Sequence, residues 1–319
     1  MWPLIKILPV TTNFRFVAFA RLAGALSILA VVGSLALTLL PFEPPCGGLN
    51  CGIDFRGGTV LEISTAPKAV DLGKTRAALG AMELGDVQVQ AFGAPSSAMV
   101  RFQTPAGESP AETVDHVKAK LTETLGQVRF ARADVVGPKV SGELLRNGVL
   151  ALGLAIGLML LYIWFRFELQ FGLGAVMALF HDVILTFGMI ALAKLEFSLT
   201  TIAAILTIIG YSMNDTVVVF DRLRENLRKY KKMPLREVID LSINETLSRT
   251  VITGLTAILA LGGLALFGGP TLFGFSIIMM FGIALGTYSS IYVAAPVILL
   301  WGVKRGEEAE VILPADVRP

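Results

Sequence analysis

The chain has 319 residues, of which 54% are hydrophobic and 16% are charged, with a formal net charge of +2 and a mean hydropathy of +0.69. Soluble domains carry about 25% charged residues, so these values exclude an average soluble domain and indicate an integral membrane protein. Basic residues do not alternate with aromatic residues in any run, which argues against nucleic-acid binding.

An apolar helix of about 20 residues crosses a hydrocarbon core. The first block of that length, 22–40, is too long for the apolar region of a signal peptide, and no cleavage site follows it, so we expect an uncleaved anchor. Further apolar blocks follow a long polar segment, and the last block is longer than one span requires. The sequence therefore predicts six transmembrane helices, within 22–40, 147–165, 172–193, 199–220, 250–268 and 272–301.

The basic residues of short loops indicate the side of the membrane that each loop occupies. The segment 221–249 contains eight Lys and Arg residues, whereas the short loops on the opposite side contain only Lys194. We therefore expect that segment and both termini in the cytoplasm, and the long polar segment in the periplasm. The predicted regions are the cytoplasmic tails 1–21 and 302–319, the periplasmic domain 41–146, and a helical region 147–301 that contains the cytoplasmic loop 221–249.

Within the polar segment, residues alternate between apolar and polar in some stretches and follow a helical period in others. Ser109 and Glu112 at the start of the second helix form the sequence of a capping box, and 94–97 is expected to connect the two central strands. This fold serves many functions, and the segment contains no nucleophile–base set, phosphate-binding loop or metal-ligand cluster, so we expect no enzyme, metal or cofactor. A ferredoxin-like α+β domain is predicted from the order strand 57–65, helix 71–82, strand 86–93, strand 98–104, helix 109–126 and strand 128–137.

Asp215 lies inside the fourth apolar block, about six residues or 9 Å of helix rise from the charged boundary at Asp221. A charge at the centre of a span costs on the order of 3 kcal/mol, so such a residue is expected to face protein or water. Thr207, Tyr211 and Asn214 cluster on the same flank, which predicts a polar stripe facing the bundle interior or a hydrated cavity. Alternatively, Asp215 only joins helices through hydrogen bonds, although a neutral residue would do so at a lower desolvation cost.

Other polar features leave alternatives open. Arg249 begins the fifth span, where it could serve membrane topology alone or pair with the carboxylate of the fourth span to create a titratable site. His181 and Asp182 lie mid-span, and because adjacent helical residues point about 100° apart, both cannot face one cavity squarely. A proton path and helix packing are equal competitors for this pair. Cys46 and Cys51 could form a small disulfide outside the cytoplasm or remain free thiols.

Several ordered segments resemble a known family. They are GIDFRGG (52–58), VGPKVSGELL (136–145), HDVILTFG (181–188), GYSMNDTVVVFDRLREN (210–226), SINETLSRT (242–250) and GTYSSIYVAAPVILLW (286–301). On these segments the chain resembles the SecF branch of the SecD/SecF family of bacterial protein-export membrane proteins, related to the resistance-nodulation-division (RND) transporters, over 22–301. The resemblance implies a multi-pass protein of the bacterial inner membrane that helps the SecYEG channel export unfolded secretory proteins with energy from the proton-motive force.

The resemblance also implies residue roles and partners. Asp215 and Arg249 would act together in proton movement, with Asn214 beside them. Because one six-span, RND-type half unit matches only part of a twelve-span unit, a separate SecD partner is implied, and YajC is a further candidate partner. The alternatives are a non-conducting scaffold of the translocase and an RND-like small-molecule exporter subunit. Structural or coupling roles are implied for Asp54, Arg56, Gly57, Gly58, Val136, Gly137 and Pro138.

Overall fold

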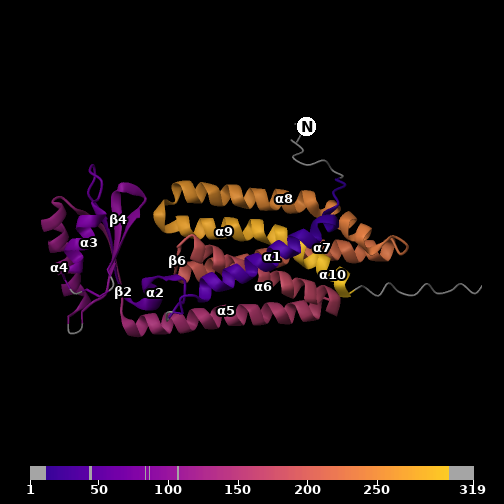
Figure 1. Ribbon diagram of the computed structural model, residues 1–319, viewed down its shortest axis with the longest axis horizontal. Coiled ribbons are helices and arrows are strands. Elements are labelled where there is room, and N and C mark those ends of the chain that lie inside the picture. The colour runs from indigo at the N-terminus through magenta and orange to yellow at the C-terminus, as the bar shows by residue number, and fades with distance from the viewer. Residues whose placement is uncertain (1–11, 43–44, 83, 86, 106–107, 302–319) are drawn as a thin grey trace, which may run out of the picture.

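The computed structural model describes residues 12–42, 45–82, 84–85, 87–105 and 108–301, so the tail 302–319 and the first part of the tail 1–21 lie outside the described residues. The chain forms a bundle of long helices with an α+β domain at one end (Figure 1). We call the α+β part, residues 58–136, the sheet domain. This architecture confirms the predicted fold class.

Six helices in the described residues are long and apolar enough to cross a membrane, as predicted. The last span is not a uniform α-helix, because a π-helical turn interrupts it. The elements of the bundle are α1 (Phe16–Leu39), α5 (Pro138–Arg166), α6 (Leu169–Leu192), α7 (Leu199–Lys229), α8 (Leu235–Phe267), α9 (Gly269–Ser289), the π-helix η1 (Ser290–Ala294) and α10 (Ala295–Trp301).

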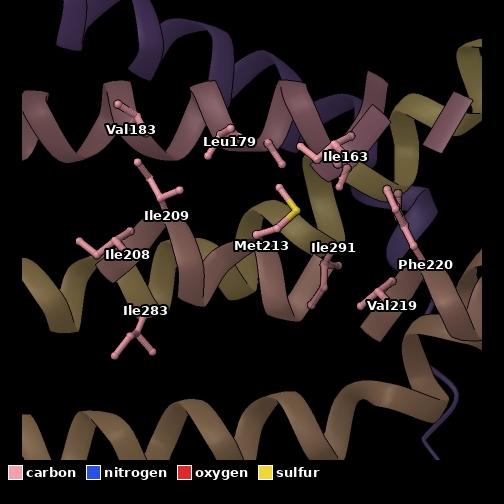
Figure 2. Packing of buried hydrophobic residues seen from close by; sticks show 14 of the residues in the cluster. Ile163, Leu179, Val183, Ile208, Ile209, Met213, Val219, Phe220, Ile283 and Ile291 are labelled. Carbon is pink, nitrogen blue, oxygen red and sulfur yellow. The ribbon is translucent and has the colours of Figure 1, made fainter. Parts of the chain in front are cut away.

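The centre of the bundle is formed by α6, α7 and α9, whose apolar side chains interdigitate (Figure 2). Leu179, Ile208, Met213 and Ile283 are among the residues buried there. In α6 and α7, 56% of the apolar stretch is buried, compared with 11% in α1, α5 and α8. The less buried helices therefore present long apolar faces to lipid or to a partner subunit.

The segment 221–249, which is expected to connect the fourth and fifth spans, is mostly helical. Helices α7 and α8 both continue into this segment, and only 230–234 connect them. They continue because Leu223 and Val238 remain buried in the same hydrophobic cluster as the spans. Pro234 lies at the N-cap of α8, where its missing N–H removes no helical hydrogen bond.

The sheet domain has four strands in the order β3-β4-β2-β5, and all neighbouring strands are antiparallel. Helices α3 and α4 cover the face of the sheet that points away from the bundle (Figure 1), above the fully buried Leu61 and Ile63. This is the predicted ferredoxin-like arrangement. The elements are β2 (Gly58–Ser64), α3 (Leu72–Gly80), β3 (Gln88–Phe92), β4 (Ala94–Phe102), α4 (Pro110–Leu125) and β5 (Arg129–Val136).

Two local predictions in this domain have different outcomes. The expected connection at 94–97 is wrong, because β4 already begins at Ala94. The turn is shorter, and it uses Gly93 at a φ of 73°, which glycine adopts without a steric penalty. The capping box of α4 is confirmed: Glu112 N donates to Ser109 Oγ at 3.3 Å, and Ser109 N donates to Glu112 Oε2 at 3.2 Å.

A short joint connects the sheet domain to the bundle. Strand β1 (Asn50–Cys51) pairs in parallel with β6 (Glu196–Phe197), and α2 (Ile53–Arg56) follows β1. Cys46 and Cys51 are joined by a disulfide, which is one of the two states that the sequence left open. On the other side of the domain, β5 leads directly into α5.

Candidate functional site

The carboxyl group of Asp215 is buried between α7 and α8, and the residue is 9% exposed. Its Oδ1 accepts a hydrogen bond from Thr250 Oγ1 at 2.7 Å. Its Oδ2 is buried and has no hydrogen-bond partner in the part of the chain that the structure describes. Buried polar atoms are almost always hydrogen-bonded, so this half-satisfied carboxyl group requires an explanation.

Arg249 precedes Thr250 on α8, and its side chain is exposed. Among the described residues, no ion pair joins Arg249 to Asp215, so the pairing that the sequence left open is not made in this arrangement. The guanidinium nevertheless acts electrostatically on the Asp215 carboxyl group. A cation therefore lies within electrostatic range of the buried acid without being bonded to it.

The polar flank of α7 does not face the interior of this bundle along its whole length. Thr207 and Asn214 are exposed, Tyr211 is half-buried, and Asp215 is buried. Of the two surroundings expected for this stripe, the interior of this chain's own bundle therefore applies to Asp215 but not to Thr207 and Asn214. The reason is that α7 packs against α6, α8 and α9, which leaves one flank of the helix open beside the buried acid.

His181 and Asp182 form a second polar cluster, deeply buried in α6 at 5% and 1% exposure. His181 Nδ1 lies 2.8 Å from Asp182 Oδ1, and Nε2 lies 3.2 Å from Ser27 Oγ of α1. Asp182 Oδ2 accepts hydrogen bonds from Ser212 Oγ of α7 at 2.5 Å and from Ser289 Oγ of α9 at 2.6 Å. The two side chains thus reach different helices, as their angular separation predicts, yet they also contact each other.

The serines of this cluster are functional candidates that the sequence reasoning missed. Ser289 contacts Asp182, while Ser290 Oγ lies 3.0 Å from Thr216 Oγ1, next to Asp215 on α7. These adjacent serines lie where α9 changes into the π-helix, and such turns occur often at functional sites. The signal in the sequence was a pair of serines inside an otherwise apolar span.

The GIDFRGG segment builds the joint. Gly57 and Gly58 have φ values of 74° and 112°, and a Cβ on Gly58 would lie 2.7 Å from the Phe102 carbonyl oxygen. Both positions therefore require glycine. Asp54 Oδ2 accepts a hydrogen bond from the backbone N–H of Leu199 at 2.9 Å. Because Leu199 is the first residue of α7, the joint caps the helix that carries Asp215.

The other candidate residues near the joint lie at the ends of strands and helices. Val136 pairs with Gly58 in the sheet, Gly137 is the N-cap of α5, and Pro138 is its first residue, where proline is favoured. Arg56 is the last residue of α2. In the described residues, no group of three or more His, Cys, Asp or Glu side chains could hold a metal ion.

Arg101 of β4 ties the sheet domain to both strands of the joint. Its Nη2 forms an ion pair with Glu196 Oε1 at 2.9 Å, and its Nη1 donates to the Cys51 carbonyl oxygen at 3.1 Å. A cleft of about 660 Å³ lies between the open face of the sheet and the end of the bundle, and Glu196 lines it. The joint, the cleft and the start of α7 are therefore in contact.

The chain matches two family descriptions. The first, "Protein export membrane protein SecD/SecF, C-terminal", matches residues 116–304, and the second, "SecD/SecF GG Motif", matches residues 48–69. The chain is 46% identical over 318 residues to the protein translocase subunit SecF of Rhodobacter capsulatus, covering 95% of this chain and 93% of the relative. It is 41% identical over 306 residues to the subunit of the same name from Rickettsia bellii, covering 95% of this chain and 98% of that relative.

Two solved structures are also similar. A crystal structure of SecDF from Thermus thermophilus, titled a translocon-associated membrane protein, has a TM-score of 0.81 and 35% sequence identity, and covers 92% of this chain. A crystal structure of SecDF in a super-membrane-facing form has a TM-score of 0.63 and 34% identity, and covers 94% of this chain. The chain spans only 39% and 40% of the lengths of these two proteins.

Proposed function

The chain belongs to the SecD/SecF family as a SecF protein translocase subunit with a role in protein export, and from this premise we propose that it uses the proton-motive force to promote late steps of export. In this proposal the subunit works with SecD beside the SecYEG channel. Protonation and deprotonation of Asp215 drive a change in helix packing that the joint transmits to the sheet domain.

The half-satisfied carboxyl group of Asp215 carries this proposal. An ionised carboxylate accepts hydrogen bonds at both oxygens, but Oδ2 has no donor among the described residues. A protonated carboxyl group needs fewer donors and carries no charge, so it tolerates this surrounding better. The site therefore suits a group that gains a proton in one arrangement and loses it in another.

Arg249 supplies the difference between the two arrangements. When Asp215 is neutral, no charge attracts the Arg249 guanidinium to it, and no ion pair between the two side chains is present among the described residues. When Asp215 is ionised, the attraction favours a packing of α7 and α8 that brings the two groups together. A proton that crosses the membrane supplies about 2.3 kcal/mol per 100 mV, and a two-state packing converts such a bias into movement.

The path of this movement would run from α7 to the joint. Asp54 caps the first residue of α7, and Glu196 binds Arg101 of the sheet domain. A shift of α7 would therefore change the cleft beneath the sheet, where an unfolded secretory protein would be held. The unequal TM-scores against the two SecDF structures, 0.81 and 0.63, support a fold with more than one arrangement.

The proposed SecD partner is supported by the comparisons. The chain covers 93% of a SecF subunit but only about two fifths of each solved SecDF protein, so a SecD subunit would supply the rest of the unit. The exposed flank of α7 at Asn214, beside Asp215, is the surface that SecD would cover. SecYEG, and YajC as a further component, are expected neighbours of the complex, and unfolded secretory proteins are its cargo.

The chain is a multi-pass protein of the inner membrane, and the excess of Lys and Arg in 221–249 supports cytoplasmic termini. The disulfide between Cys46 and Cys51 supports the same orientation, because disulfides persist mainly in oxidising compartments such as the periplasm. The sheet domain would then lie in the periplasm.

Two rival functions remain testable. A scaffold of the translocase would need Asp215 only for hydrogen bonding, which Asn provides without charge. An RND-like small-molecule exporter would need a larger outer domain than the single ferredoxin-like unit of this chain. Neither rival explains why a buried acid keeps one oxygen without a donor among the described residues.

The test uses inside-out membrane vesicles that contain this chain, SecD and SecYEG. Completion of translocation is followed after ATP is exhausted, with and without a proton gradient. Asp215→Asn should abolish the gradient-dependent step at matched membrane levels. Asp221→Asn is the control, because that carboxylate lies on the same helix but is exposed and paired with Arg166. Wild-type translocation by Asp215→Asn would favour the scaffold.

A further inference from the structure

The cluster around His181 continues into a linear chain of hydrogen bonds that the proposed function does not use. Ser27 Oγ lies 2.9 Å from the hydroxyl of Tyr288, and that hydroxyl donates to the Ala23 carbonyl oxygen at 3.0 Å. Together with the contacts from Asp182 to His181 and from His181 to Ser27, four hydrogen bonds run in sequence from α6 through α1 to α9 and back to α1.

The number of protons available for these four hydrogen bonds can be counted. A carboxylate and a carbonyl oxygen stand at the two ends, and both can only accept. Each of the three groups between these ends supplies one proton: a neutral imidazole, a serine hydroxyl and a tyrosine hydroxyl. Three protons are therefore available for the four hydrogen bonds described above. All four hydrogen bonds form only when this series of groups holds one more proton. An imidazolium at His181 supplies that proton, because both of its ring N–H groups donate.

The second oxygen of Asp182 identifies the form that this proton takes. Asp182 Oδ2 accepts hydrogen bonds from Ser212 and Ser289, and the Ser289 hydroxyl also lies 3.2 Å from the Gly286 carbonyl oxygen. Donors to this oxygen stabilise the ionised form of the carboxyl group. An ionised Asp182 at 1% exposure needs a compensating positive charge, because an isolated buried charge is very costly.

No other cation in the described residues contacts this pair. The side chains that face it are Ser27 from α1, Ser212 from α7, and Tyr288 and Ser289 from α9. The next titratable groups are Tyr292 of η1, whose ring lies 5.3 Å from that of Tyr288, and Asp215, three residues after Ser212. The nearest cation on these helices is Arg21 of α1, which lies six residues before Ser27 and is exposed. Among the described residues no ion pair joins Arg21 to Asp182, so the compensating charge belongs to His181.

We propose that the His181–Asp182 pair is a second proton-binding site of this chain, separate from Asp215, and that it holds one proton at neutral pH as an imidazolium–carboxylate pair. Ser27 and Tyr288 position the proton through the hydrogen-bond chain that ends at Ala23. The site lies about one helical turn from Asp215 along α7, toward the sheet domain, since Ser212 precedes Asp215 by three residues.

The chain allows a direct measurement, because it contains only two histidines. His116 lies on α4 in the sheet domain, so a His116→Gln background leaves His181 as the single imidazole. The full chain is labelled with ¹⁵N-histidine, placed in lipid nanodiscs, and its ring nitrogen signals are recorded at pH 7.5, where a free imidazole is mostly neutral. We expect both nitrogens of His181 to be protonated.

Removing the buried negative charge removes the need for a compensating proton. In Asp182→Asn, we expect a neutral His181 ring with only one protonated nitrogen. Asp182→Ser should have the same effect, and it serves if the first variant folds poorly. Tyr292→Phe is the matched control, because it removes a neighbouring hydroxyl outside the hydrogen-bond chain.

The proposal is overturned if either ring nitrogen of His181 carries no proton in the parent chain at pH 7.5, or if both nitrogens stay protonated in Asp182→Asn and Asp182→Ser alike. Neither result bears on the gradient-dependent step of translocation, which is measured separately with Asp215→Asn. The two proposals can therefore fail independently.

Discussion

Asp182 and Asp215 are both carboxyl groups inside apolar helices, yet their surroundings differ. Asp182 has hydrogen-bond partners at both oxygens, whereas Asp215 has one among the described residues, at Oδ1 only. Hydrogen bonds to an ionised group stabilise that form, so in our proposals Asp182 keeps one charge state and Asp215 does not. The half-satisfied group is the one suited to change its charge during a cycle.

Thr250→Val tests this difference at Asp215. Valine has nearly the shape of threonine but cannot donate, so Oδ1 of the buried Asp215 carboxyl group loses its donor and, like Oδ2, has none among the described residues. An unsatisfied buried polar group costs about 1–3 kcal/mol, so we expect a lower midpoint of thermal unfolding in nanodiscs and a weaker gradient-dependent step. Thr250→Ser retains the hydroxyl and should retain most of both properties. Unchanged unfolding in the valine variant would show that the bond contributes nothing.

One residue-level prediction depends on a residue type that is unusual for its surroundings, because a carboxylate within an apolar block singles out Asp215. Asp54 is a candidate only through the resemblance of the GIDFRGG segment to a known family. The partners of the buried His181–Asp182 pair could not be found by this reasoning. Ser27 is 154 residues from its partner His181, Ser289 is 107 residues from its partner Asp182, and serine is common in membrane helices.

At the scale of elements, strong local signals gave correct predictions. The capping box at Ser109 sets the start of α4, and apolar length sets the six spans. The errors occurred where tertiary packing decides. Burial of Leu223 extends α7 beyond the charged boundary, and strand pairing across Gly93 extends β4 into the expected connection. The positions of charged and turn residues in the sequence do not predict these tertiary contacts.

The capping box gives α4 a dependence on pH. Hydrogen bonds from Ser109 hold the pKa of Glu112 below its usual value of 4.5. Stabilisation of the first turn is therefore complete above pH 4.5 and is lost as the pH falls through the lowered pKa. Amide exchange of that turn, corrected for its intrinsic rate, should accelerate across this window in the wild type. Glu112→Gln should show no such acceleration, and an equal response in both proteins would contradict the assignment.

At the scale of the whole molecule, three contacts fix the sheet domain to the bundle. They are the ion pair of Arg101 with Glu196, the pairing of β1 with β6, and the cap that Asp54 provides to α7. All three meet at the start of the helix that carries Asp215. The sheet domain and the candidate proton site are therefore mechanically connected, although they were predicted as separate features.

Glu196→Gln should loosen this connection. The change removes the charge opposite Arg101, whose side chain is only 13% exposed, and hydrogen bonds to charged groups contribute about 1.5–3 kcal/mol. We expect amide exchange at Gly52, which donates to the Phe197 carbonyl oxygen, to accelerate at least about tenfold, the rate equivalent of 1.4 kcal/mol. Glu123→Gln breaks a surface pair with Lys120 and is the control, with little expected effect.

Helix α5 gives the molecule a lever arm. It is one helix of 29 residues, which is about 44 Å long, and only Gly137 separates it from the last strand of the sheet domain. An object fixed to the end of a stiff rod moves in proportion to its distance from the pivot. For a rod of this length, a tilt of about 10° sweeps the end through about 8 Å, a little more than two residues of extended polypeptide. Under the proposed function, a small tilt of packed helices would thus move the sheet domain by about the length of two residues of the exported chain.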